Sequence, residues 1–125
     1  MNRPIPILRA LVLAAAALTG CDQAPDKIVE LTGGNPHKGK TAIDAYGCGS
    51  CHTIPGVRGA NALVGPPLTQ IGSRVYIGGV LQNNPDNMLR WLHDPPAVDP
   101  KTAMPNLHLT DSDARDIAAY LYTLK

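Results

Sequence analysis

The residues Cys48-Gly49-Ser50-Cys51-His52 constrain this chain more than any other stretch of its sequence. They place two thiols three positions apart, within one helical turn, and a histidine directly after the second thiol. This order of residues is the attachment signature of a c-type haem, in which both thiols bind vinyl groups of one porphyrin. The sequence therefore predicts one covalently attached haem, with Cys48 and Cys51 as the attachment residues and His52 as the proximal axial ligand.

Two other kinds of site share part of this pattern. A thioredoxin-like redox pair has the same cysteine spacing, but it is expected within a βαβ unit, and the sequence shows no such pattern. A zinc site needs four ligands, and the third cysteine of the chain, Cys21, does not belong to a second cysteine pair. Neither alternative uses the histidine that follows, so haem attachment is the favoured interpretation.

The first twenty residues have the composition of an export signal. Two arginines precede an apolar stretch at residues 10–18, which is too short to span a bilayer. The Leu-Thr-Gly-Cys sequence at residues 18–21 resembles a bacterial lipobox, in which the cysteine is diacylated and the chain is cleaved before it. We therefore predict a lipoprotein signal peptide at residues 1–20 and a lipidated Cys21. An ordinary signal peptide and an uncleaved anchor are the alternatives.

Export and haem attachment indicate the same compartment, because c-type haem is attached outside the cytoplasm. We expect the protein in the bacterial cell envelope, anchored to a membrane by lipid on its periplasmic side. The chain has 11 Lys and Arg and 10 Asp and Glu. Two of the basic residues lie in the predicted signal peptide, which leaves nine basic against ten acidic residues. This balance does not suit a nucleic-acid partner and gives only modest electrostatic steering.

The segment after the predicted signal peptide is expected to be a flexible tether over residues 21–36. It is polar, shows no hydrophobic periodicity and ends in Gly-Gly-Asn-Pro. A flexible chain of this length has an end-to-end distance of about 20 Å. The folded domain is therefore predicted to span residues 37–125.

Hydrophobic periodicity predicts a helix near each end of this domain. In residues 37–47, the i, i+3, i+4, i+7 spacing of one helix face is occupied by Gly39, Ala42, Ile43 and Tyr46. Thr110 has the position of a helix cap. After it the same spacing recurs at Ala114, Ile117, Ala118 and Leu121. Each helix is expected to bury this face.

Between these helices, glycines and prolines divide the chain. The segment after His52 is predicted to be a loop, and residues 69–83 one short helix or a pair of turns. Asn84 is predicted to cap a third helix, which ends before Pro95. The proline-rich residues 95–109 are predicted to be a loop.

In this order the elements resemble those of the class I cytochromes c: a short helix, the haem motif, a Gly-Pro loop, a tryptophan-bearing helix, a methionine loop and a closing helix. The resemblance covers residues 37–125. It implies an all-α cytochrome c fold, in which short helices and loops wrap around one covalently attached haem. It also implies a monohaem electron carrier that cycles between Fe(II) and Fe(III), and not an enzyme.

The resemblance also implies roles for four further residues. The carbonyl of Pro66 matches the family position that accepts a hydrogen bond from the second ring nitrogen of His52. Trp91 matches the tryptophan whose indole N–H reaches a haem propionate. Gly39 matches the small residue where the two terminal helices cross, and Tyr120 matches the aromatic that packs there. A contact between Gly39 and Tyr120 is therefore expected.

Met104 is the predicted distal ligand of the iron. It lies in a proline-rich loop just before the last helix, which is also the family position. A histidine and a thioether raise the reduction potential of a haem into the electron-transfer range. Met88 lies on a predicted helix, where methionine usually packs in the core. His93 and His108 are alternative ligands, and either would give a bis-histidine haem of lower potential.

These residues favour an electron carrier, because an iron with both axial positions filled has no site left for a substrate. A haem enzyme or a gas-binding sensor, with Met104 off the iron, is the second interpretation. A dedicated subunit of a larger complex is the third. By analogy with the family, the redox partners are a quinol-oxidising complex, a terminal oxidase or a periplasmic dehydrogenase.

Overall fold

The computed structural model describes residues 24–125, so the predicted signal peptide and the predicted lipidation of Cys21 lie outside the described residues. The elements follow in the order α1 (Ala24–Thr32), α2 (Pro36–Ala45), η2 (Cys48–Ser50), η3 (Ile71–Ser73), β1 (Tyr76–Ile77), β2 (Leu81–Gln82), α3 (Pro85–His93), α4 (Pro95–Val98) and α5 (Asp111–Thr123). The domain is mostly helical, as predicted, with one small two-stranded sheet. Within the described residues, no helix has both the length and the apolar character needed to cross a bilayer.

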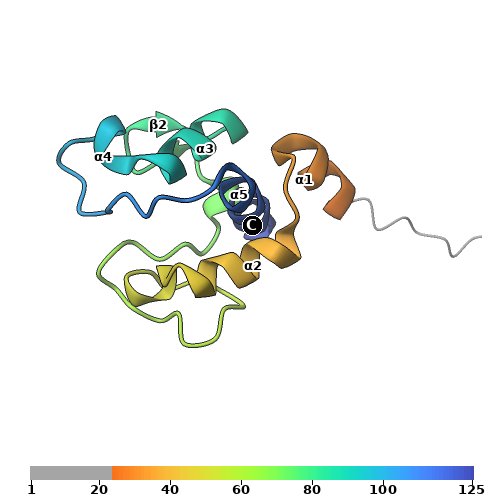
Figure 1. The fold of residues 1–125 in the computed structure, drawn as a ribbon, viewed down its shortest axis with the longest axis horizontal. Helices are drawn as coiled ribbons and strands as arrows, with labels where there is room; N and C mark the ends of the chain where they lie inside the picture. The colour runs from red at the N-terminus through yellow and green to blue at the C-terminus, as the bar shows by residue number, and fades with distance from the viewer. Residues whose placement is uncertain (1–23) are drawn as a thin grey trace, which may run out of the picture.

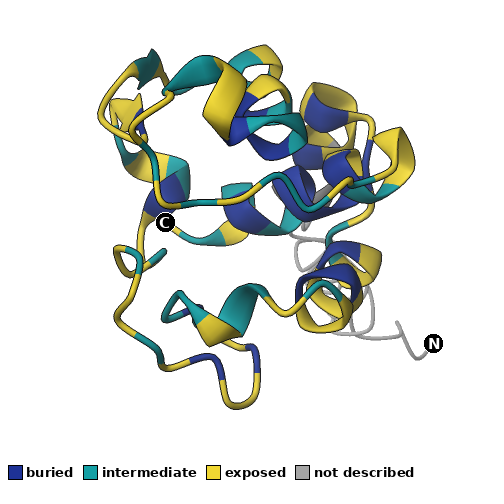
Figure 2. Cartoon of the chain, turned by 60° about the vertical axis from the view of Figure 1, so that its left-hand side comes forward, coloured by how far each residue is buried: buried dark blue, intermediate teal, exposed yellow. Residues whose placement is uncertain are grey.

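Helix α5 is the centre of the structure. It lies between α2 on one side and α3 on the other, and α1 packs beside it (Figure 1). Buried residues gather on α5 and on the parts of α2 and α3 that face it (Figure 2). The buried face of α5 includes the four predicted residues, Ala114, Ile117, Ala118 and Leu121. The predicted face of α2 is also confirmed, since Gly39, Ala42 and Ile43 are buried and Tyr46 is half-buried.

Helices α2 and α5 touch through their backbones at Gly39. A Cβ atom at this position would overlap the carbonyl oxygen of Asp116 and lie 3.0 Å from the backbone nitrogen of Ile117. The predicted small residue at the crossing is therefore confirmed, and the predicted contact of Gly39 with Tyr120 stays a prediction. Tyr120 lies one helical turn later, where its hydroxyl donates a hydrogen bond to the carbonyl of Pro55 at 2.7 Å.

The prediction of an irregular tether over residues 21–36 is wrong for its described part. Residues 24–32 form α1, in which Ile28 and Thr32 are buried. The turn that follows is fixed to α5, because the backbone N–H of Asn35 donates to the Asp116 carboxylate at 2.6 Å. A nine-residue helix is marginal in isolation, so its stability comes from packing on α5. Among residues 27–32 of this helix, whose burial is described, Ile28 and Thr32 are buried, and two such residues one turn apart give too little periodicity to be recognised in the sequence.

The predicted helix caps are present. The side chain of Asn84 accepts a hydrogen bond from the backbone N–H of Asn87 at 2.9 Å, and α3 ends at His93, before the first of two prolines. The side chain of Thr110 accepts from the backbone N–H of Asp113 at 3.1 Å. The proline-rich loop contains one turn that was not predicted, α4, which Asp94 caps by accepting from the Ala97 N–H at 3.3 Å.

Residues 69–83 contain one predicted turn, η3, but also a β-hairpin that was not predicted. Strands β1 and β2 are antiparallel, with Ile77 opposite Leu81. Residues 78–80 connect them, and within this loop Gly78 and Gly79 have φ angles of 57° and 76°. Two consecutive positive φ angles define the tight hairpin turn that glycine pairs favour. Strands of two residues are too short to show an alternating pattern.

The crossing at Gly39 generates a prediction. Replacing glycine by alanine inside a helix normally stabilises it by about 1 kcal/mol. In Gly39→Ala the new methyl group would overlap the Asp116 carbonyl, so we expect the free energy of unfolding to fall by about 3 kcal/mol. Guanidinium unfolding of the holoprotein measures this, with the exposed neighbour Lys40→Ala as the control. A Gly39→Ala variant at least as stable as the wild type would show that the helices are further apart.

Candidate haem site

The attachment motif forms one tight turn after α2. Gly47 leads into it with a φ of 70°, and the backbone N–H groups of Cys51 and His52 both donate to the carbonyl of Cys48, at 3.2 and 3.1 Å. Both cysteines of the motif are half-buried. Burial raises the pKa of the Cys48 thiol above its ordinary value. The motif therefore presents both cysteine side chains from a single turn, as the sequence predicted.

The ring of His52 is held from one side by a hydrogen bond. Its Nδ1 atom lies 2.7 Å from the carbonyl oxygen of Pro66, the contact expected from the sequence. A carbonyl can only accept, so Nδ1 carries the hydrogen, and in the neutral ring Nε2 keeps its lone pair. A partner of this kind fixes the ring orientation of a metal-ligating histidine and raises its basicity. The His52 Nε2 atom is thus prepared to bind a metal.

Gly65 lies against the same ring. In the sequence this glycine indicated only a loop. A Cβ atom here would lie 2.8 Å from the Nδ1 atom of His52 and 2.9 Å from its Nε2 atom. The Gly65 backbone N–H donates to the carbonyl of Cys51 at 2.7 Å. Gly65 and Pro66 together therefore fix the position of the imidazole relative to the attachment turn.

The loop after the motif folds back onto it. Thr53 forms an isolated antiparallel bridge with Asn61, and the Thr53 carbonyl accepts from the Leu68 N–H at 2.8 Å. Gly49 lies against Ala60, since a Cβ at position 49 would lie 2.8 Å from the Ala60 Cβ. This predicted loop is therefore a bonded support for the attachment turn, although it has no regular secondary structure.

Arg74 holds the C-terminal end of this loop through hydrogen bonds that were not predicted. Its guanidinium donates to the carbonyl of Pro67 at 2.5 Å and to that of Thr69 at 2.9 Å. The Asn83 side chain in turn donates to the carbonyl of Arg74 at 2.8 Å. The segment that carries Pro66 is thereby linked to the β-hairpin.

Met104 and Trp91 come from the other half of the domain. Met104 is half-buried in the segment between α4 and α5, packs against the apolar core and donates its backbone N–H to the Thr102 hydroxyl at 3.2 Å. Trp91 is buried on α3 with its ring against Gly78. Met88 is only 1% exposed, which confirms its expected place in the core. Iron ligation by Met104 and the propionate contact of Trp91 stay predictions.

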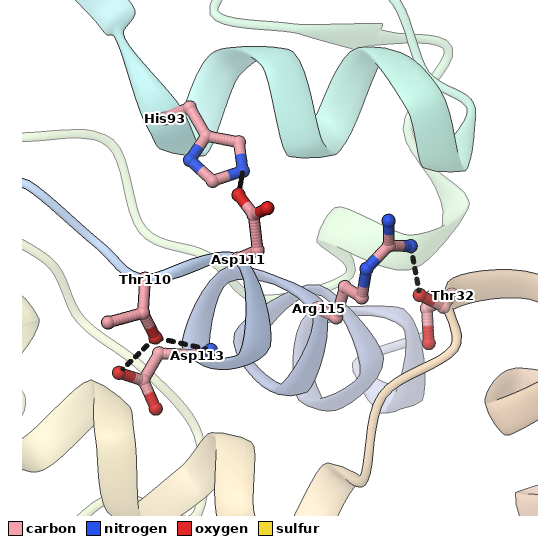
Figure 3. Close-up of polar contacts among 6 residues, drawn as sticks. All are labelled: Thr32, His93, Thr110, Asp111, Asp113 and Arg115. Carbon is pink, nitrogen blue, oxygen red and sulfur yellow. Dashed lines mark hydrogen bonds and ion pairs between the residues drawn. The ribbon is translucent and has the colours of Figure 1, made fainter.

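The alternative histidines have other surroundings. The Nε2 atom of His93 lies 3.2 Å from a carboxylate oxygen of Asp111 (Figure 3). His108 is exposed, and its backbone has a φ of 53°. In the part of the chain that the structure describes, no cluster of three or more histidine, cysteine, aspartate or glutamate side chains could hold a metal ion.

The donors of the site fit a covalently attached haem. Two half-buried thiols on one turn can make two thioether bonds, and the adjacent imidazole has its Nδ1 engaged and its Nε2 available. Met104 packs on the core on a segment distant in sequence, and its thioether as a second iron ligand stays a prediction. This set of donors agrees with the residues that the motif indicated.

Comparisons with known proteins give the family. Residues 36–125 match the family described as Cytochrome c. Three similar proteins are described as cytochrome c oxidase subunit 2. The protein from Alkalihalophilus pseudofirmus is 31% identical over 90 residues, which cover 71% of this chain. That from Bacillus sp. strain PS3 is 34% identical over 88 residues (67% of this chain), and that from Bacillus subtilis 32% over 92 residues (70%).

The chain spans about a quarter of the length of these relatives, 25%, 25% and 26% respectively. The matched region of this chain contains the attachment motif, Pro66, Trp91 and Met104. It also contains every described helix except α1. This chain belongs to the cytochrome c family, as a class I c-type cytochrome with one covalently attached haem c that serves electron transfer.

Proposed function

We propose that this protein is an electron carrier whose haem iron is bound by His52 and Met104. The observation that carries this proposal is the hydrogen bond between His52 Nδ1 and the Pro66 carbonyl, at 2.7 Å, which leaves Nε2 for the iron. The haem supplies a one-electron Fe(II)/Fe(III) couple when bound. Gly65 and Pro66 keep the imidazole in one orientation, so the proximal ligand need not move during a redox cycle.

We propose a terminal oxidase as the partner among the three classes that the family suggests. The similar proteins from three bacteria are each described as subunit 2 of cytochrome c oxidase, which supports an oxidase context. A carrier that visits such a partner needs only a small and short-lived interface. The same resemblance favours a second possibility, that this domain is a dedicated subunit of an oxidase complex. Co-purification after mild detergent extraction distinguishes the two.

We further propose that Cys21 carries a lipid that holds the domain at the periplasmic face of a membrane. The export signal and the Leu-Thr-Gly-Cys sequence at residues 18–21 support this proposal. Helix α1 begins at residue 24 and packs on α5. The linker between the lipid and the folded domain is then much shorter than residues 21–36, so the domain would stay close to the bilayer surface.

The proposed axial pair is tested by replacing Met104. The oxidised wild type should show the weak near-infrared band of a sulfur-to-iron bond, and Met104→Ala should abolish the band and lower the reduction potential. Met88→Leu, which replaces a core methionine by a side chain of similar volume, should keep the band. A wild type without the band, with a high-spin or bis-histidine spectrum that Met104→Ala leaves unchanged, would contradict the proposal and favour a sensor, an enzyme or a low-potential carrier.

The support of the proximal ligand is tested at Gly65. In Gly65→Ala the new methyl group would collide with the His52 ring, so the ring must turn away from the Pro66 carbonyl. We expect a loss of about 2 kcal/mol in the free energy of unfolding and a severalfold lower yield of low-spin holoprotein. Leu63→Ala is the control in the same loop, because Leu63 is 76% exposed. Equal spectra and yields for both variants would show that Gly65 does not support the ring.

The proposed anchor is tested with Cys21→Ser. In cells fed a labelled fatty acid, the wild type should carry the label and fractionate with membranes. The Cys21→Ser variant should lose both properties, while Asp22→Asn should keep the label. If the Cys21→Ser variant is exported, it should still attach haem, since the attachment residues are Cys48 and Cys51. A wild type that carries no label would show an ordinary signal peptide or an uncleaved anchor.

A further inference from the structure

The first turn of α5 is tied to the end of α2 through one carboxylate oxygen. The Tyr46 hydroxyl donates to Asp113 Oδ2 at 2.8 Å. The Thr110 hydroxyl donates to the same oxygen, also at 2.8 Å (Figure 3). Tyr46 is the C-cap of α2 and Thr110 is the N-cap of α5. The three side chains therefore form a continuous hydrogen-bonded connection, which we call the Tyr46–Asp113–Thr110 link.

The charge on Asp113 strengthens this link. Hydrogen bonds from Thr110 and from Tyr46 hold the pKa of the Asp113 carboxyl below its ordinary value. The hydrogen bond to Asp113 raises the pKa of the Tyr46 hydroxyl. At neutral pH the link is thus an anionic oxygen that accepts from two neutral hydroxyls, and hydrogen bonds to ionised acceptors are stronger than neutral ones. The positive end of the α5 dipole also favours an anion at this position.

The link joins the two parts of the chain that carry the proposed iron ligands. Tyr46 lies two residues before Cys48, the first attachment residue. Thr110 closes the segment of residues 94–110, which carries Met104. At the other end of this segment, the last residue of α3, His93, contacts Asp111 at 3.2 Å (Figure 3). Both ends of the Met104 segment are therefore fixed at the N-terminus of α5.

We propose that Tyr46, Asp113 and Thr110 position the Met104 segment relative to the attachment motif and so determine how often Met104 leaves the iron. This inference rests on the proposed function, in which Met104 is the distal ligand. The three residues act through the segment and are positioning residues. For Met104 to leave the iron, the segment must shift relative to α2 and α5. Breaking the link lowers the free energy of the detached state relative to the bound one.

Imidazole is a suitable probe of the detached state. It binds ferric haem at the distal position only in molecules from which Met104 has left, so its apparent affinity is proportional to their fraction. Tyr46→Phe removes the hydroxyl and keeps the ring. We expect imidazole to bind this ferric holoprotein about fivefold more tightly than the wild type, the factor expected for loss of one hydrogen bond. Loss of the near-infrared band reports the binding.

A matched control is available at the other end of α5. The Tyr122 hydroxyl donates to the Asn83 side chain at 2.8 Å, so Tyr122→Phe also removes one tyrosine hydrogen bond, but away from the Met104 segment. It should leave the imidazole affinity at the wild-type value. Thr110→Val removes both its hydrogen bond to Asp113 and the cap of α5, so it should tighten imidazole binding at least as much as Tyr46→Phe, whereas Thr110→Ser, which keeps the hydroxyl, should keep the wild-type value. Asp113→Asn removes the charge and should also tighten imidazole binding.

Tyr46→Phe in a Met104→Ala background distinguishes an effect on the position of Met104 from a general loss of stability. With no methionine to displace, Tyr46→Phe should leave the imidazole affinity unchanged. An equal effect in both backgrounds, or no difference between Tyr46→Phe and Tyr122→Phe, would overturn the positioning inference while leaving the proposed axial pair intact. A wild type that binds imidazole as tightly as Met104→Ala would show that Met104 is not a ligand, and would overturn both.

Discussion

The contact between the backbones of α2 and α5 at Gly39 determines where both halves of the haem site lie. Gly39 on α2 contacts Asp116 on α5, and Tyr46, which comes later in the chain after α2, contacts Asp113, which comes earlier on α5. The end of α2 therefore meets the beginning of α5. The attachment motif follows directly after α2, and the Met104 segment ends directly before α5. A single helix crossing thus places the attachment motif and the segment that carries Met104, the proposed distal ligand, at the same end of the helix pair.

Local signals in the sequence predicted most of this arrangement. The caps at Asn84 and Thr110 and the buried face of α5 depend on residues within a few positions of one another, so they can be recognised from one sequence. Helix α1 depends on tertiary contacts with α5 and has no comparable local signal. The hydrogen bond from the Tyr120 hydroxyl to the Pro55 carbonyl joins residues 65 positions apart and also has no local signal.

The candidate site was predictable to a similar extent. Cys48, Cys51 and His52 carry their own chemical signature, and the Pro66 contact followed from a family pattern that the geometry reproduces. Gly65 was not identified, because its role is steric and joins residues thirteen positions apart. The link at Asp113 was not identified either. Tyr46 was assigned to an apolar helix face, and no local pattern connects it with Asp113, which lies 67 residues later.

The two sides of the site are held by different kinds of contact, and this difference has a functional consequence. On the proximal side, backbone hydrogen bonds connect Gly65 with Cys51 and Leu68 with Thr53, and the Pro66 carbonyl holds the imidazole. The Met104 segment is instead anchored at its ends by side chains that are exposed or half-buried. Such side-chain contacts are individually weaker and more easily replaced by water than a backbone network. For the proposed His52/Met104 pair, exchange of an axial ligand is therefore expected on the methionine side and not on the histidine side.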